Sequence, residues 1–185
     1  MHKHRAALTA CLLGLALAAP ACITIGSSGY SGHGISFDYP DGTSEHKLKE
    51  RVSNEDRDWV VAVAGPWGDD SLIVIEGFEQ DRGGATSLTE KEYQDLVNQI
   101  RKNARESGGD PGAVAPRQVD GRQGVVFEAS AKSYSGAEVK QHVAFIVDMA
   151  ANRNLRISCQ YTEEYRDGVL KACESLLAGI DLDAK

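Results

Sequence analysis

The sequence lacks the short motifs that mark common catalytic and nucleotide-binding sites. It contains no GxxxxGKS/T phosphate loop, no HExxH zinc motif, no GxSxG nucleophile elbow and no CxxC pair. Its histidines beyond the first 22 residues are His33, His46 and His142. His142 follows Lys140 on the more polar face of an expected strand, where a solvated histidine is expected rather than a general base. The residues therefore predict no catalytic site, no metal site and no cofactor.

Positive charge is also scarce. The chain has 20 lysines and arginines against 27 acidic residues, a net charge of −7. The first 22 residues contain Lys3 and Arg5 and no acid, so the remainder carries −9. Such a chain is a poor candidate for nucleic-acid binding, which needs cationic surface to release phosphate counterions. An anionic membrane surface would repel it unless a covalent anchor holds it, and a protein partner is expected to be basic.

No hydrophobic run is long enough to span a bilayer. The longest, Ala6–Ala19, has 14 residues and follows the basic segment Met1–Arg5. This pattern predicts a signal peptide over residues 1–21. Cys22 then stands where a bacterial lipoprotein signal places its acylated cysteine, although Ala19-Pro20-Ala21 equally suits ordinary signal peptidase. A second match to the lipoprotein signal ends at Cys11, but the hydrophobic segment before that cysteine is too short for a signal peptide.

Cysteine is sparse, and its count is informative. Of the four cysteines, Cys11 leaves with the signal, so Cys22, Cys159 and Cys173 remain. An odd number in an oxidising compartment favours lipid on Cys22 and a disulfide between the other two. Cys159 lies on the apolar face of an expected strand and Cys173 on the apolar stripe of the helix after it, at similar depths along the two elements. Two buried free thiols are the alternative.

The strand and helix just mentioned form the most regular stretch of the sequence. Residues 154–161 alternate, with Leu155, Ile157, Cys159 and Tyr161 on one face, which is typical of a half-buried strand. Thr162 is the expected N-cap of a helix that ends near Gly179. The apolar stripe of this helix contains the following residues: Tyr165, Val169, Ala172, Cys173, Leu176, Leu177 and Ile180.

The rest of the chain supplies more strands and one more helix. Residues 22–34 combine the anchor cysteine with a glycine- and serine-rich flexible tether, and a globular domain is expected over residues 35–185. Thr89-Glu90-Lys91-Glu92 forms a capping box that begins the other helix. Strands are expected over 35–39, 59–64, 71–78, 113–119, 124–129 and 139–149. This order predicts an α+β domain with a mainly antiparallel sheet.

Two segments of this domain are candidates for recognition. Glu45–Asp58 is highly charged, which fits an exposed edge strand and loop, with a recognition loop as the alternative. Trp67, Asp69 and Asp70 lie between the expected strands 59–64 and 71–78. An exposed indole beside acids is a common anchor for a partner, so these three residues are the predicted partner-binding site. The alternatives are a tryptophan folded back onto the sheet and two solvated loop acids.

Several of these features together resemble a known fold. The signal with Cys22, the Tyr39-Pro40-Asp41-Gly42 turn and the strand–cysteine–helix ending are similar to the PsbP/Mog-type fold and, more narrowly, to the LpqN-type lipoproteins of actinobacteria. The resemblance implies an antiparallel sheet with helices on both faces, an α/β/α sandwich. It also implies a non-catalytic role in protein binding or assembly, and it carries no catalytic residue onto this chain.

These observations favour an exported bacterial lipoprotein, held on the outer face of the plasma membrane, that binds an envelope protein partner. Without acylation of Cys22 the protein would be secreted. A carrier that holds a lipid or small apolar molecule between helix and sheet is the first alternative, and an envelope hydrolase is the second. A continuous apolar cavity would favour the carrier, and a His–carboxylate–Ser cluster would favour the hydrolase.

Overall fold

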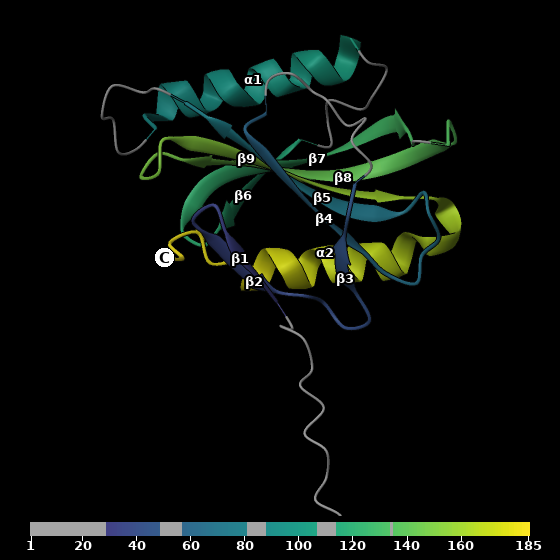
Figure 1. Cartoon of the computed structure of the whole chain (residues 1–185). Helices are drawn as coiled ribbons and strands as arrows, with labels where there is room; N and C mark the ends of the chain where they lie inside the picture. Colours follow the sequence, from purple (N-terminus) through teal and green to yellow (C-terminus); the bar gives the residue numbers. More distant parts are fainter. Residues whose placement is uncertain (1–28, 49–56, 81–87, 107–113, 134) are drawn as a thin grey trace, which may run out of the picture.

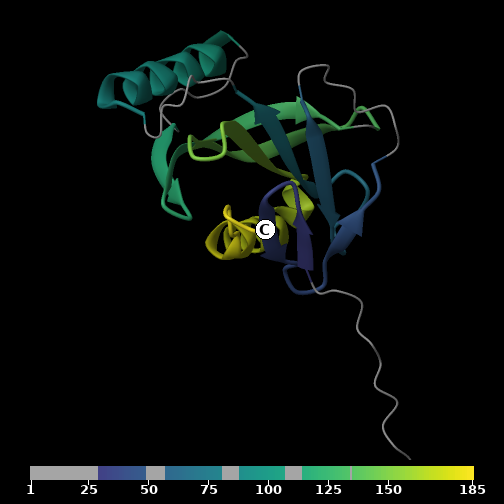
Figure 2. The same cartoon turned by 60° about the vertical axis from the view of Figure 1, so that its left-hand side comes forward.

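The computed structural model describes residues 29–48, 57–80, 88–106, 114–133 and 135–185. These residues form a seven-stranded antiparallel sheet in the order β3-β4-β5-β9-β8-β7-β6, with a separate β1–β2 hairpin beside it. One helix lies on each face of the sheet (Figures 1 and 2). The predicted α+β fold with helices on both faces of the sheet is therefore confirmed. The strands and helices have these bounds: β1 Gly29–Gly32, β2 Ile35–Asp38, β3 Ser44–His46, β4 Trp59–Ala64, β5 Leu72–Glu79, α1 Glu90–Glu106, β6 Ala115–Val119, β7 Arg122–Lys132, β8 Glu138–Asp148, β9 Arg153–Tyr161, the 3₁₀ turn η2 Glu163–Tyr165 and α2 Arg166–Gly179.

Strand β9 is the centre of the sheet, paired with β5 on one side and β8 on the other. Its apolar face packs under α2, as its period of two predicts: Leu155, Ile157 and Cys159 have no exposed surface. The polar face is also covered, and Ser158 and Gln160 are buried. The expectation of a half-buried strand is corrected here, because β9 has buried residues on both of its faces.

Helix α2 is held to this strand by a covalent bond. Cys159 and Cys173 form the predicted disulfide, with their Cα atoms 6.0 Å apart. Around it, Val169, Leu176 and Leu177 are buried in the main core cluster. The start of the helix differs from the expectation: η2 precedes α2, and Thr162 makes no side-chain capping hydrogen bond. The 3₁₀ turn takes up the sharp reversal between strand and helix.

Helix α1 covers the opposite face with a smaller cluster. Its predicted capping box is confirmed, since the Thr89 N–H donates to Glu92 and the Glu92 N–H donates to the Thr89 hydroxyl. Tyr93 and Val97 pack on Val125 of β7, and the Tyr93 hydroxyl donates to the Gly124 carbonyl over 3.0 Å. The buried face of α1 therefore meets the β7 side of the sheet.

The β1–β2 hairpin corrects the predicted start of the domain. Residues 29–34, expected in the flexible tether, form β1 and the turn into β2. Tyr30 stacks on Phe37 with ring centroids 5.4 Å apart, and His33 stacks on Trp59 at 4.7 Å. These aromatic contacts order a segment whose glycines and serines indicate flexibility.

A buried arginine ties this hairpin to the sheet. Arg153 donates to the buried carboxylate of Asp148 over 2.9 Å. It also donates to the carbonyls of His33 and Gly34 in the β1–β2 turn, and to the Leu182 carbonyl over 2.8 Å. One guanidinium therefore joins the β8–β9 turn, the N-terminal hairpin and the C-terminal segment.

The charged segment Glu45–Asp58 is described only at its ends. Its first residues belong to β3, an edge strand as expected, and residues 49–56 lie outside the described part of the chain. At the other end, Arg57 pairs with Glu76 over 2.9 Å, and both side chains are almost fully buried. Arg156 donates to the other oxygen of Glu76 over 2.6 Å. This end of the segment is therefore bound to the sheet.

Candidate functional site

Three connections lie together at one end of the sheet, here called the three-turn end: the β4–β5 loop, the β7–β8 turn and the junction between β9 and η2. Antiparallel pairing brings them together, because Leu72 pairs with Gln160 and Lys140 pairs with Tyr161. Hydrogen bonds then link the loops. The Gln160 amide donates to the Asp70 carbonyl over 2.9 Å, and the Thr162 N–H donates to the Ser71 hydroxyl over 3.2 Å.

Asp70, one of the predicted partner-binding residues, connects two of these loops. Its carboxylate accepts a hydrogen bond from the Ser135 hydroxyl over 2.8 Å. Hydrogen bonds from Ser133 and Ser135 lower the pKa of Asp70, because they favour its ionised form. Asp69 beside it is exposed. Asp70 therefore has a structural contact within the molecule, and Asp69 presents its side chain to solvent.

The expectation of an exposed indole at this loop is wrong. Trp67 is only 7% exposed and belongs to the main core cluster. Its ring folds back onto Gly65 and toward Gly168 of α2, where a Cβ would lie only 2.8 Å and 3.0 Å from indole atoms. The two glycines leave the space that the ring occupies, so burial of apolar area draws the indole inward. The structure thus separates Trp67 from the exposed Asp69.

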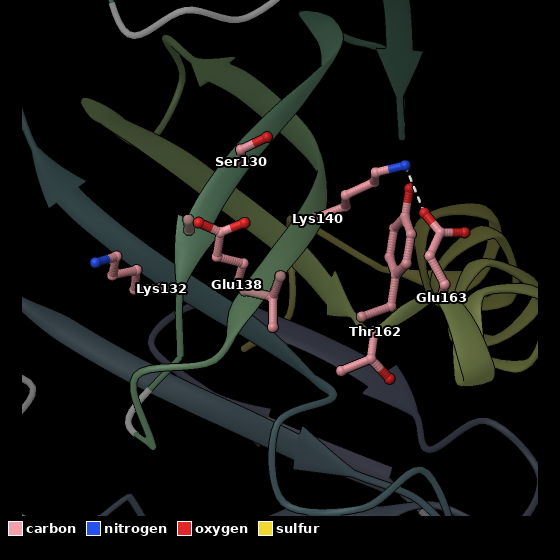
Figure 3. Close-up of a pocket in the computed structure, with 9 residues that line it drawn as sticks. Ser130, Lys132, Glu138, Lys140, Thr162 and Glu163 are labelled. Atoms are coloured by element: carbon pink, nitrogen blue, oxygen red, sulfur yellow. Dashed lines mark ion pairs between the residues drawn. The ribbon is translucent and has the colours of Figure 1, made fainter.

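A hollow of about 470 Å³ opens beside these loops, on the α2 face of the sheet (Figure 3). We call it the hairpin hollow, because the end of the β7–β8 hairpin forms most of its wall. Val139 and Ala131 line it along with Tyr161. Its other lining residues are polar or charged: Ser130, Lys132, Glu138, Lys140, Thr162 and Glu163. The hollow therefore combines charges of both signs with apolar lining surface.

The charges at this hollow are partly ordered. Lys140 and Glu163 form an ion pair between β8 and η2 (Figure 3). A hydrogen bond and the attraction of Glu163 raise the pKa of Lys140, and Lys140 lowers the pKa of Glu163 in the same way. Both side chains are exposed, so salt screens this interaction. The pair orients one cation and one anion without burying either.

A hydrogen-bonded chain runs along the sheet from the hollow toward α2. The Tyr161 hydroxyl donates to Glu128 over 3.1 Å, and the other Glu128 oxygen lies 2.7 Å from Nδ1 of His142. Among the described residues, Nε2 of His142 has no hydrogen-bond partner, and it lies 3.8 Å from Glu174. His142 is therefore mostly covered, which corrects its expected place as a solvated strand histidine.

This chain has the histidine and carboxylate of an acid–base site. In the described contacts, however, its hydroxyl group is that of Tyr161, whose pKa is raised by burial and by Glu128. A phenol held protonated in this way is a poor nucleophile. Within the described ranges, no three histidine, cysteine or acidic side chains gather as metal ligands.

Sequence reasoning found the loop acids but missed the residues of the hairpin hollow. The sequence of β8 nevertheless contains a pattern that indicates this hollow. On the face of β8 that α2 covers, residues change from apolar Ala144 and Ile146 to polar His142, Lys140 and Glu138 toward the turn. Such a change along one face marks the point where a strand leaves the core.

The remaining predicted site residue is Cys22, which lies outside the described residues. Within the described residues, no helix has the length and apolar character needed to cross a membrane.

Comparisons with known proteins identify the fold. A solution structure of cyanobacterial PsbP (CyanoP) from Synechocystis is 15% identical and covers 87% of this chain and 96% of its own, with a TM-score of 0.54. A crystal structure of a Bacteroides thetaiotaomicron protein is 13% identical with a TM-score of 0.52. That match covers 86% of this chain but 48% of the other, so this chain spans about half of that protein. The sequence matches no family model and no curated protein. The chain therefore has a PsbP-like fold.

Proposed function

We propose that this chain is an exported, membrane-tethered lipoprotein of the LpqN-like type that acts as a non-catalytic binding or assembly factor in the bacterial cell envelope. Cys22 carries the lipid anchor, and each buried methylene of its acyl chains contributes about 0.8 kcal/mol to membrane binding. The disulfide supports export, because such bonds persist in oxidising compartments. With Cys159 and Cys173 paired, Cys22 is the cysteine left over for acylation.

The observation that carries the binding role is the hairpin hollow together with Asp69 and Asp70 at the three-turn end. This surface combines ordered charges of both signs with an exposed acid on loops that hydrogen bonds hold in place. A preformed surface loses little entropy on binding. The partner is an envelope protein whose basic surface meets Asp69 and Asp70, and encounter weakens as salt increases.

The packing between α2 and the sheet favours a binder over a lipid carrier. Val169 and Leu176 of α2 belong to one core cluster with Ile75 and Ile157 of the sheet, and each has almost no exposed surface. A carrier would need open apolar volume in this layer. The hydrogen-bonded series from Tyr161 to His142 is the feature closest to a hydrolase site. Its hydroxyl group is the Tyr161 phenol, which is a poor nucleophile.

Site-specific photocrosslinking in the native envelope tests this proposal. A photoreactive residue at exposed Lys132, on the wall of the hairpin hollow, should give a discrete adduct with one partner. The same residue at exposed Lys102, on α1, is the matched control and should not. The adduct should decrease in Asp69→Asn/Asp70→Asn protein and at high salt. Identical adducts from both positions, or an adduct insensitive to both changes, would contradict the proposed surface.

A further inference from the structure

A second concavity lies between α2 and the turn that follows β2. It has a volume of about 490 Å³, and we call it the Trp67 groove. Tyr39 and Pro40 form one wall, Pro66 and Trp67 contribute to its floor, and α2 forms the other wall. Four ring side chains therefore surround a single groove.

The β2 wall is fixed by local hydrogen bonds. Both the N–H and the hydroxyl of Thr43 donate to the Pro40 carbonyl, over 3.0 Å and 2.7 Å. Gly42 has a φ of 76°, the left-handed conformation that this turn requires and that glycine adopts without strain. The Tyr39 ring packs edge-on against Phe37, with centroids 5.7 Å apart. The wall is thus ordered before any ligand arrives.

The α2 wall is low because small residues line it. Gly168, Ala172, Ser175 and Gly179 face the groove, spaced so that they follow one side of the helix. Small side chains let the backbone of a ligand approach the helix closely. Lys171 stands on the same rim.

The floor carries a hydrogen-bond donor with no acceptor. Trp67 is 93% buried, since 7% of its surface is exposed. Its Nε1 lies 3.0 Å from the point that a Cβ on Gly168 would occupy, at the groove wall. The hydrogen bonds found among the described residues include none from this N–H. An indole N–H is a donor only, so a carbonyl oxygen of a ligand in the groove is a suitable acceptor for it.

We infer that the Trp67 groove binds an extended, proline-rich segment of a partner protein, in the polyproline II conformation, with basic residues at one end. This inference rests on the proposed binding function and names the partner chemistry. A polyproline II segment makes no internal hydrogen bonds, so its carbonyls are free to accept from the Trp67 N–H. A bound helix would use most of its carbonyls itself. Proline rings also fit between ring-lined walls at little cost in conformational entropy.

The charges at the rims set the direction of the segment. Asp38 and Asp41 are exposed on the β2 wall, and Lys171 is exposed on the α2 wall. Arginine or lysine at one end of the segment meets the two acids, and Lys171 faces the backbone carbonyls or an acid at the other end.

The two tryptophans of the chain make the test direct. Trp59 and Trp67 give two indole N–H resonances in the ¹⁵N-labelled full-length chain, and Trp59, stacked on His33, serves as the internal reference. The probe is a short synthetic peptide with prolines at every third position and arginines at one end. Titration should move the Trp67 indole proton downfield and leave the Trp59 proton in place. Asp38→Asn/Asp41→Asn should weaken binding about tenfold.

A matched pair of variants separates groove binding from general effects on α2. Ser175→Gln places a longer side chain in the groove and should abolish binding, whereas Ala178→Gln, exposed on the same helix outside the groove lining, should retain it. A peptide with alanine in place of proline should bind at least about tenfold more weakly. An unmoved Trp67 resonance, equal binding by Ser175→Gln, or equal binding of the alanine peptide or of a peptide with glutamates for arginines would overturn the inference. If the groove inference fails but the proposed binding role is correct, the photocrosslink from Lys132 should still form.

Discussion

The two helices cover the sheet in different ways. Helix α2 is joined to β9 by a disulfide and shares a large core cluster with five strands of the main sheet and with β2. Helix α1 rests on a small cluster around Tyr93, Val97 and Val125. Both concavities described above lie on the α2 side. The comparison indicates that the fold places its recognition surfaces beside the covalently fixed layer, where walls keep their shape.

The largest effect is expected at Arg153, on the α2 side. Arg153→Met leaves the buried Asp148 carboxylate without its main partner and frees both the β1–β2 turn and the C-terminal segment. We expect a loss of about 3–5 kcal/mol in the free energy of unfolding, measured by urea denaturation. Arg105→Met, at an exposed position on α1, is the matched control and should cost little. Equal losses from the two variants would remove the distinction between the layers.

The disulfide is the next contributor. Its loop spans a sequence separation of 14, for which cross-linking stabilises a protein by about 3 kcal/mol through the unfolded state. The double variant Cys159→Ala/Cys173→Ala should lower the urea midpoint accordingly, and a reductant should then have no further effect on it. Thiol labelling of the denatured, unreduced wild type should find both cysteines protected. Labelling of both residues would contradict the bond.

On the α1 side, a single change should have a smaller effect. Tyr93→Phe removes the hydroxyl that donates to the Gly124 carbonyl and keeps the ring in its cluster. The expected loss is about 1 kcal/mol, seen as a shift in the urea midpoint. A loss as large as that of Arg153→Met would show that α1 is held as firmly as α2.

The smallest effect is expected at the Lys140–Glu163 pair. Lys140 lowers the pKa of Glu163, so the stabilisation from this carboxylate is present above its unfolded-state pKa and is lost as pH falls through the lowered value. Lys140 has a raised pKa, so its contribution is lost only as pH rises through that raised value. Carboxyl titration by NMR should find Glu163 below its ordinary range, and Lys140→Ala or high salt should restore it. No change in Lys140→Ala would exclude the ion pair.

Regular periodicity made most of the fold predictable. The alternation in β9, the α2 stripe and the Thr89 capping box are local patterns, and each appears in the structure. The Asp120-Gly121 dipeptide is another local pattern, typical of a tight hairpin turn, and its φ values of 46° and 73° match such a turn between β6 and β7. The disulfide was predictable because the alternation in β9 and the stripe of α2 each place one cysteine on the face that packs against the other element.

The features that sequence reasoning missed depend on contacts between distant segments. Glycine-rich residues 29–34 became a strand because rings and Arg153 from elsewhere hold them. For Trp67 the sequence left an exposed and a folded-back ring open, and the folded-back alternative is confirmed because Gly168, distant in sequence, leaves room for the ring. The hairpin hollow arises where β8, β9 and η2 meet. Local patterns do not show which distant segments meet. For the hairpin hollow they show only the polar end of β8, and the hollow itself exists only after the sheet has assembled.

The central claim is that α2 with β9 forms a rigid support for both concavities, whereas α1 is a more weakly held cover. Amide hydrogen exchange of the full-length chain under native conditions tests it most directly. The amides of α2 and β9 should exchange only through global unfolding, and those of α1 should exchange faster, through local opening. Exchange of α1 as slow as that of α2, or a loss of α2 protection while α1 remains protected, would contradict the claim.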